Sequence, residues 1–435
     1  MNEKEVLPFD FEKATNKQII KVIGVGGGGG NAVKNMFREG IHDVAFALCN
    51  TDVQAFTDSE IPLKVQLGRS GLGAGNNPAK AASDAEESIE AIKELFADET
   101  KMVFITAGMG GGTGTGASPV IAREAKAAGM LTVGVVTIPF RFEQRPKINQ
   151  ALQGVDAIAE HVDALLVINN QRLFGIYPTM PINEGFAKVN EILTVAVKSI
   201  AELITVRGTI NLDFHDVQKV LKNGGVAVMS YGIGSGEHRL TAAINEALHS
   251  PLLNDNDVYN SKKILFNIYQ SKTNPLFMNE MDELTQFMDE FRNKDIEVIW
   301  GIADDETLGD KVKITILATG FGLNNLLGIE VGKKHAEKKD VASEKADVMP
   351  DADTTVPDGA ALAETEPVEN PRVTVSAEER YISIYGEDIH TFLFNDEDLF
   401  DDILIDAVSS SPTFKRTIDN VKTLQATRKA ARNAI

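Results

Sequence analysis

Three glycine-rich segments could bind phosphate through their backbone. Gly26–Gly30 follow an apolar run, "GMGGGTGTGA" follows another at 108–117, and "GRSGLGAGNNP" occupies 68–78. Because glycine lacks a Cβ atom, successive backbone N–H groups can crowd around an anion at the start of a helix. A turn without a function needs only one or two glycines. These segments therefore predict an anion-binding site.

A second candidate is the carboxylate-bearing sequence "GTINLDFHD" at 208–216. Taken alone, it predicts a helix start, with Asp213 as the N-cap and Asp216 near the positive end of the helix.

The first glycine segment also fits G-x-G-x-x-G through Gly24, Gly26 and Gly29, which is typical of a dinucleotide site. In that interpretation Asp52 would bind a ribose hydroxyl of NAD in an oxidoreductase. Such a domain needs a single phosphate loop, whereas this chain has several, and it lacks the P-loop sequence with its lysine. The glycine segments therefore favour a nucleoside triphosphate held by backbone amides.

The elements that position these residues alternate along the first half of the chain. Continuously apolar runs predict strands at 21–26, 43–50, 102–108, 131–139 and 164–170. Helices are expected to open at Asn31 and near Ser118 and Pro119. This order is typical of an α/β fold with a parallel sheet covered on both faces, whose ligands bind beyond the carboxyl ends of the strands.

One long apolar helix pattern covers 183–206 and spans roughly 35 Å. It predicts a strut to a second α/β domain, with strands at 225–234, 262–270, 296–304 and 311–321 and helices at 239–249 and 280–293. Asp213 and Asp216 follow the far end of the strut. We therefore expect that they cannot reach a nucleotide bound by their own chain.

These patterns divide the chain into six predicted parts. They are an N-terminal extension at 1–19, a nucleotide-binding domain at 20–182, the central helix at 183–206, a C-terminal domain at 207–331, a disordered linker at 332–378 and a tail at 379–435. The tail is acidic at 387–406 and basic after Ser411.

The composition excludes several classes of protein. A net charge of -20 argues against nucleic acid as a partner. Cys49 is the only cysteine, which suits a reducing cytoplasm, and no apolar run approaches the roughly 20 residues of a membrane span. No metal-ligating cluster stands out.

Together, "GVGGGGGNAV", "NTD", "GLGAGNNP", "GMGGGTGTGA", "PFRFEQRPK" and "NLDFHD" closely resemble the FtsZ family of bacterial tubulin-like cell-division GTPases over residues 20 to about 322. The resemblance implies bound GTP or GDP, with Mg²⁺ held by the phosphates. The implied nucleotide-binding residues are Gly27, Gly28, Gly29, Gly30, Asn31, Asp52, Ala74, Gly75, Asn76, Gly110, Gly111, Gly112, Thr113, Gly114, Glu143, Lys147, Phe186 and Asn190.

Several of these residues have specific implied roles. Ala74 to Asn76 would sense the γ-phosphate, Glu143 would bind ribose and Phe186 would stack on guanine. Lys147 replaces the arginine usual in the family, and Asn190 occupies a position often held by Asp.

The resemblance also implies that catalysis depends on assembly. Asp213 and Asp216, helped by Asn211, would act in trans on the nucleotide of the next subunit in a head-to-tail protofilament. The homopolymer would form the cytokinetic ring at mid-cell in the cytoplasm. A tubulin-like plasmid or phage filament, or a filament that does not hydrolyse its nucleotide, are the alternatives.

Membrane-tethering division adaptors are the implied partners of the tail. "SPTFKR", Ser411–Arg416, loosely resembles the family's terminal peptide, and the basic residues after it could extend the contact. The acidic segment 387–406 has no clear counterpart in the family, and it could either pair with the basic tail or bind a lineage-specific partner.

Overall fold

The structure is a computed structural model, and it describes residues 18–41, 43–177, 179–206, 208–249, 258–291, 296–321 and 380–382. The predicted linker at 332–378, the acidic segment 387–406 and Ser411–Arg416 lie outside the described residues.

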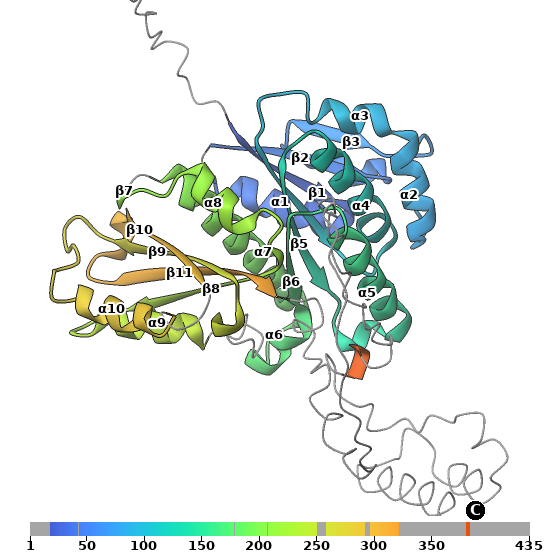
Figure 1. The fold of residues 1–435 in the computed structure, drawn as a ribbon. Helices are drawn as coiled ribbons and strands as arrows, with labels where there is room; N and C mark the ends of the chain where they lie inside the picture. Colours follow the sequence, from blue (N-terminus) through green and yellow to red (C-terminus); the bar gives the residue numbers. More distant parts are fainter. Residues whose placement is uncertain are drawn as a thin grey trace, which may run out of the picture.

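A single sheet of eleven strands runs through the described residues, in the order β3-β2-β1-β4-β5-β6-β8-β11-β9-β10-β7 (Figure 1). Neighbours from β3 to β8 are parallel, whereas β11 is antiparallel to both β8 and β9. The strands are β1 Ile20–Val25, β2 Val44–Asn50, β3 Leu63–Gln66, β4 Met102–Gly108, β5 Leu131–Ile138, β6 Ala164–Asn169, β7 Gly208–Ile210, β8 Gly225–Gly234, β9 Lys263–Gln270, β10 Glu297–Asp304 and β11 Val312–Phe321.

Helices cover both faces of the parallel part of the sheet, where β1 and β5 are buried along their whole length. One core lies between the sheet and α1, α7 and α8, a second beneath α3, α4 and α5, and a third between β8–β11 and α9 and α10. The helices are α1 Gly26–Arg38, α2 Pro78–Glu87, α3 Ile89–Glu94, α4 Gly112–Ala127, α5 Arg145–Ala159, α6 Asn170–Ile176, α7 Ile182–Thr205, α8 Phe214–Leu221, α9 Arg239–Leu248 and α10 Met281–Asp289, with short 3-10 turns η2 Val53–Phe56, η3 Arg141–Glu143, η4 Val258–Asn260 and η5 Glu306–Leu308.

The predicted fold class is confirmed, and every predicted strand is present to within about two residues. The long helix α7 begins and ends one residue earlier than predicted. β3 and β7, with four and three residues, have no matching prediction because runs this short carry little periodic signal.

Two predicted helix starts are wrong. α1 begins at Gly26 rather than Asn31, and α4 begins at Gly112, so that Pro119 lies inside it. Several of these glycines lie within helices, where they allow neighbouring backbone segments to pack closely. A Cβ on Gly116 would lie 2.0 Å from the Pro78 carbonyl oxygen, which no side chain tolerates.

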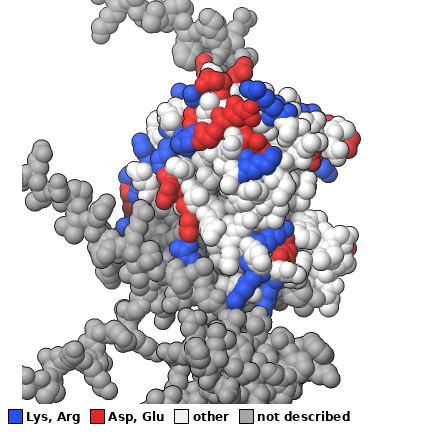
Figure 2. Space-filling model, turned by 90° about the vertical axis from the view of Figure 1, so that its right-hand side faces the viewer, with Lys and Arg blue, Asp and Glu red and all other residues white. Residues whose placement is uncertain are grey.

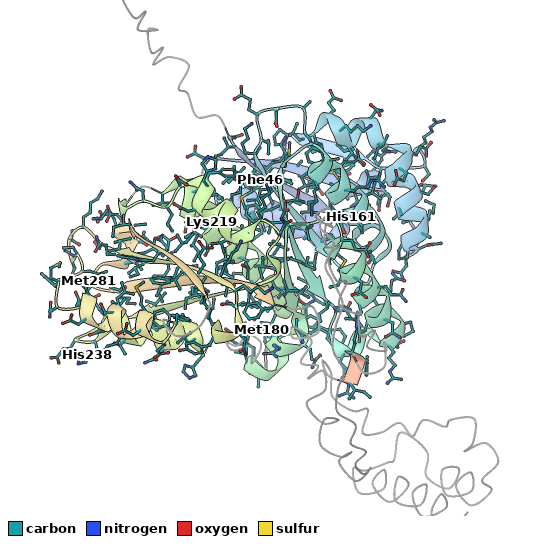
Figure 3. The ribbon with its side chains drawn as sticks, viewed as in Figure 1. Phe46, His161, Met180, Lys219, His238 and Met281 are labelled. Atoms are coloured by element: carbon teal, nitrogen blue, oxygen red, sulfur yellow. The ribbon has the colours of Figure 1, made fainter. Side chains whose placement is uncertain are left out.

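Side chains fill the space between the layers along the whole body (Figure 3). Phe46 on β2, labelled there, meets the Phe37 ring of α1 edge-on at 5.7 Å. The face in Figure 2 shows acidic and basic side chains interspersed around a broad uncharged area. Among the described residues, no helix is long and apolar enough to cross a membrane.

Candidate nucleotide site

The glycine segments 26–30 and 108–117 lie against each other at the carboxyl ends of β1 and β4. A Cβ on Gly26 would lie 2.8 Å from the Gly114 nitrogen, and one on Gly28 would lie 3.2 Å from the Gly108 Cα. Gly26 also has a φ of 71°, in the left-handed region that favours glycine. The approach of the two segments therefore depends on the missing side chains.

This contact brings the N-termini of α1 and α4 to one place. The first four N–H groups of a helix have no partner within the helix, and the helix dipole adds positive potential there. Neither α1 nor α4 has an acidic residue in its first turn. Two helix ends without opposing carboxylates make a site for an anion with several charged oxygens.

A cavity of about 430 Å³ opens in front of these helix ends. Eleven of the predicted nucleotide-binding residues line it, from the glycine segments, η3, α5 and α7. They are Gly27, Gly28, Asn31, Gly111, Gly112, Thr113, Gly114, Glu143, Lys147, Phe186 and Asn190.

The third loop lies behind this cavity, against the start of α4. A Cβ on Gly112 would meet Ala74 Cβ at 3.0 Å and the Asn76 carbonyl carbon at 3.2 Å. Gly75 and Asn76 both have φ near 60°, which turns the chain sharply before Asn77 caps α2. Ala74, Gly75 and Asn76 are thus adjacent to the site without lining the cavity.

Four other predicted residues do not line this cavity. The Gly110 N–H donates to Thr115 Oγ1 at 2.8 Å, so this amide is engaged within the protein. A Cβ on Gly29 would lie 2.0 Å from the Thr106 carbonyl oxygen, which gives Gly29 a packing role. Gly30 lines a smaller cavity of about 220 Å³ next to α1. Asp52 Oδ1 accepts the Gln54 N–H and caps η2.

The rim opposite the glycines combines charge with aromatic surface. Lys147 Nζ lies 2.7 Å from Glu143 Oε2, and Glu143 Oε1 accepts the Phe140 N–H at 2.8 Å. Phe186 is 42% exposed, and its ring meets Phe140 edge-on at 5.3 Å. This exposed aromatic surface is available to a planar ligand such as a purine.

Seven lining residues were not predicted, namely Gly108, Met109, Thr137, Pro139, Asn170, Val189 and Leu193. Gly108 ends β4, while Thr137 lies near the end of β5 and Asn170 directly follows β6, so the carboxyl-end rule could have found them. Among the described residues, none forms a hydrogen bond with the buried Asn170 Oδ1. An unsatisfied buried acceptor in this cavity suits a ligand with N–H or O–H donors.

The predicted catalytic residues lie beyond the other end of α7, whose 24 residues span about 36 Å. Asp213 Oδ1 accepts the N–H groups of His215 and Asp216, while Asp216 Oδ2 accepts the Asp213 N–H at 3.0 Å. This capping box confirms the predicted helix start. Asn211 Oδ1 accepts the Gly208 N–H at 2.7 Å. One oxygen of each carboxylate has no part in these bonds.

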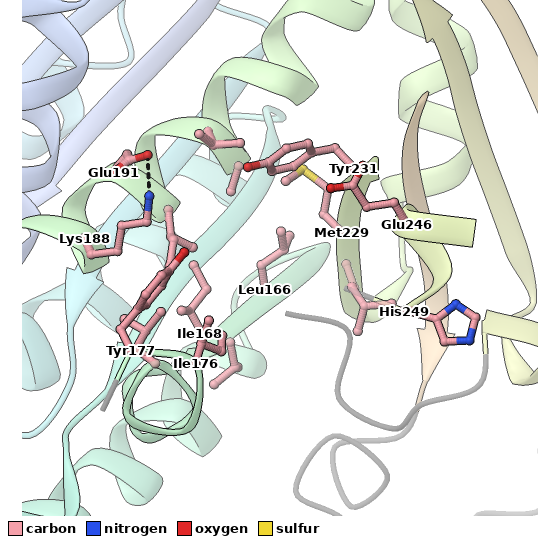
Figure 4. A pocket seen from close by; sticks show the side chains of 17 residues that line it. Leu166, Ile168, Ile176, Tyr177, Lys188, Glu191, Met229, Tyr231, Glu246 and His249 are labelled. Atoms are coloured by element: carbon pink, nitrogen blue, oxygen red, sulfur yellow. Dashed lines mark hydrogen bonds and ion pairs between the residues drawn. The ribbon is translucent and has the colours of Figure 1, made fainter. Parts of the chain in front are cut away.

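A second cavity, of about 400 Å³, lies between α6, α7, β8 and α9 (Figure 4). Its lining is largely apolar, with Tyr177, Met229 and Tyr231 around it and the Lys188–Glu191 ion pair at 2.7 Å on α7. None of the predicted nucleotide-binding residues lines it. It has no glycine-rich helix start, so it is not the anion site.

Sequence profiles of known families match three parts of the chain. The GTPase domain of the tubulin/FtsZ family matches residues 19–178, the C-terminal domain of the FtsZ family matches 225–322, and a further FtsZ C-terminal region matches 387–431. The last match shows that the expectation of no family counterpart for 387–406 is wrong. The acidic composition of that segment does not by itself reveal this relationship.

Relatives of known identity match over most of their length. The cell division protein FtsZ of Porphyromonas gingivalis is 52% identical over 326 residues, covering 74% of this chain and 71% of the relative. The FtsZ of Wigglesworthia glossinidia brevipalpis is 40% identical over 337 residues, covering 77% of this chain and 87% of the relative.

Solved structures agree with this relationship. An empty FtsZ dimer from M. jannaschii is 38% identical with a TM-score of 0.64, covering 71% of this chain and 90% of that one. A CetZ2 protofilament from Haloferax volcanii, at 20% identity and a TM-score of 0.58 over 70% and 93% of the two chains, shares the fold. The paired glycine segments thus belong to a GTPase domain, and the chain is a member of the FtsZ family of tubulin-like cell-division GTPases.

Proposed function

We propose that this chain binds GTP between the two glycine-rich helix ends and hydrolyses it where two copies meet in a head-to-tail filament. The observation that carries the proposal is the separation of two half-sites along α7. The cavity of the anion cradle is lined by residues in the first half of this helix, whereas Asp213 and Asp216 lie beyond its other end. Half-sites so far apart can work together only between copies, and a head-to-tail contact repeats into an open filament.

Each group in the cradle has a distinct proposed part. The free N–H groups at the starts of α1 and α4 would bind the phosphates, with Ala74, Gly75 and Asn76 supporting the γ-phosphate side. Glu143 would bind the ribose, and Lys147 would interact with the nearby negative charge of the nucleotide. The exposed ring of Phe186 would stack on guanine. Asn190 and Asn170 would meet the edge of the base. The positions of Gly110, Gly29 and Asp52 favour a supporting role for these three.

In the next subunit, Asp213 and Asp216 would accept hydrogen bonds from the attacking water through the oxygens that the capping box leaves over. Phosphoryl transfer depends mainly on positioning and charge stabilisation, so orienting this water is the principal task of the second half-site. Asn211 Oδ1 accepts the N–H of Gly208, the first residue of β7, and this bond would support the loop that carries the two carboxylates.

The described residues contain no group of three or more His, Cys, Asp or Glu that could hold a metal. Mg²⁺ would therefore be bound mainly by phosphate oxygens and water, as is usual for this ion. Its chemistry would be to neutralise the phosphate charge. The hydroxyl of Thr113, which lines the cavity, would be an additional oxygen ligand within the site.

We further propose that the filaments form the cytokinetic ring at mid-cell in the cytoplasm. Membrane-tethering division adaptors would bind the tail through Ser411–Arg416 and the basic residues after it. Family membership supports division rather than plasmid segregation or nicotinamide chemistry.

The test is to measure phosphate release per chain with GTP, GDP and ATP over a wide range of protein concentration, together with light scattering. We expect release with GTP alone, rising with concentration in step with scattering. Release per chain that stays constant on dilution below the scattering threshold would contradict the proposal.

A further inference from the structure

A short segment from the end of the chain contacts the GTPase domain. Residues 380–382 form a helical turn close to α5, drawn in orange in Figure 1. An Nη atom of Arg380 lies 2.8 and 2.6 Å from the two carboxylate oxygens of Asp156 on α5. The Arg380 side chain is only 16% exposed. Partly buried Arg–carboxylate contacts of this kind are among the stronger polar contacts in proteins.

The next residue makes a second, independent contact. The Tyr381 ring lies beneath the guanidinium of Arg145, 4.4 Å from its central carbon, and the residue is only 4% exposed. Arginine packed over an aromatic face is attracted by the ring quadrupole. Arg145 and Asp156 lie at opposite ends of α5, so the two contacts fix both the position and the direction of the turn.

We infer that Arg145 and Asp156 form a recognition site for an Arg-Tyr pair, and that its occupant is Arg380-Tyr381 of the same chain. The charges are complementary, since a carboxylate meets the arginine and a guanidinium meets the aromatic ring. The turn lies between two matches to FtsZ profiles, one that ends at residue 322 and one that starts at residue 387. The turn is therefore an anchor that precedes the terminal family region.

The anchor changes where that terminal region starts. The 58 residues between Phe321 and Arg380 could extend over about 200 Å if nothing held them. With Arg380 and Tyr381 held against α5, the terminal family region would begin five residues after Ile382, a stretch that reaches at most about 18 Å. The terminal region would thus start from the GTPase domain, beside the rim that carries Glu143 and Lys147, rather than from the end of β11.

The inference does not depend on GTP hydrolysis, and its test uses distance rather than activity. Spin labels are attached to full-length chain carrying Glu160→Cys and Ser383→Cys, and their separation is measured by pulsed electron resonance. The natural Cys49 is fully buried and does not compete for label. We expect a single narrow distance below about 25 Å, because Glu160 lies one helical turn beyond Asp156.

Charge variants then test the pairing. Arg380→Glu should broaden the distance distribution, and Arg380→Glu combined with Asp156→Arg should restore the narrow population. Arg123→Glu is the matched control, since Arg123 makes a similar two-bond contact with Glu86 elsewhere on the surface and should leave the distance unchanged. A tenfold excess of unlabelled chain should also leave the distance between the labels unchanged, because both labels are on the same chain. A broad distribution in the parent chain, or a narrow one lost on this dilution, would overturn an anchor within one chain.

Discussion

Replacing Asp216 by Asn separates the catalytic role proposed for this residue from its structural one. In the structure Asp216 Oδ2 accepts the Asp213 N–H, and an amide oxygen can accept the same bond. An Asn at this position therefore keeps the capping box, and the free energy of unfolding should fall by less than about 1 kcal/mol. The carboxylate charge next to the attacking water is lost.

Removal of a group that orients and deprotonates water typically lowers a rate by about 10² to 10⁴-fold, equivalent to roughly 3–5 kcal/mol in the activation barrier. The expected increase in the activation free energy of hydrolysis is thus several times larger than the expected decrease in the free energy of unfolding. We expect Asp216→Asn to bind GTP, to assemble and to form longer-lived polymers.

The assay compares phosphate release at a concentration where the parent chain assembles, with thermal unfolding as the control for folding. Asp305→Asn is the matched control variant, because Asp305 also caps a short helix through its carboxylate but has no proposed part in hydrolysis. It should retain turnover. Full turnover by folded Asp216→Asn would refute the reasoning.

Three further predictions concern the cradle and the buried thiol. Gly27→Asp should weaken GTP binding at least tenfold in a filtration assay, because it adds a negative charge at the anion site. Gly27→Ala adds no charge, and its Cβ meets no protein atom within 4 Å, so it should weaken binding much less. Equal affinities of the two variants would contradict the cradle. Phe186→Ala should weaken GTP binding by about 1–3 kcal/mol, the usual range for stacking on a base, with unchanged unfolding; no change would exclude stacking. Burial raises the pKa of the Cys49 thiol from 9.0 to about 12, so the unfolded chain loses this proton first and stability falls as pH rises above 9. Between pH 9.5 and 11, the free energy of unfolding of the parent, measured by chemical denaturation, should fall by about 1.4 kcal/mol per pH unit relative to that of Cys49→Ser. The same pH dependence in both proteins would contradict this prediction.

Much of the fold follows from the sequence because its strands are continuously apolar. β1, β4 and β5 are long enough and buried enough to give an unambiguous signal. The predicted start of α4 is wrong because a run of glycines is more typical of a loop than of a helix. In the structure their small size serves close packing, as with Gly114, whose Cβ would lie 2.5 Å from the Gly108 carbonyl oxygen.

The site was predictable where a residue type has only one physical use, and less so where it has several. Five of the nine predicted glycines and Phe186 line the cavity. Gly29 and Gly110 instead serve packing and an internal hydrogen bond. Asp52 has a local use as the cap of η2, and nothing in its sequence context separates that use from ligand binding. Asn170 was missed as a site residue because its importance comes from its place after β6 and its unpaired oxygen, both of which require the fold.

A mixing experiment tests the central claim most directly. Gly27→Asp should abolish the cradle of a chain while leaving its acidic loop intact, and Asp216→Asn should do the reverse. If one nucleotide is shared between two copies, each variant alone releases little phosphate, and their mixture releases much more than the sum because intact half-sites meet at some contacts. A mixture that releases only the sum of the two would show that each chain hydrolyses its own nucleotide, against this account.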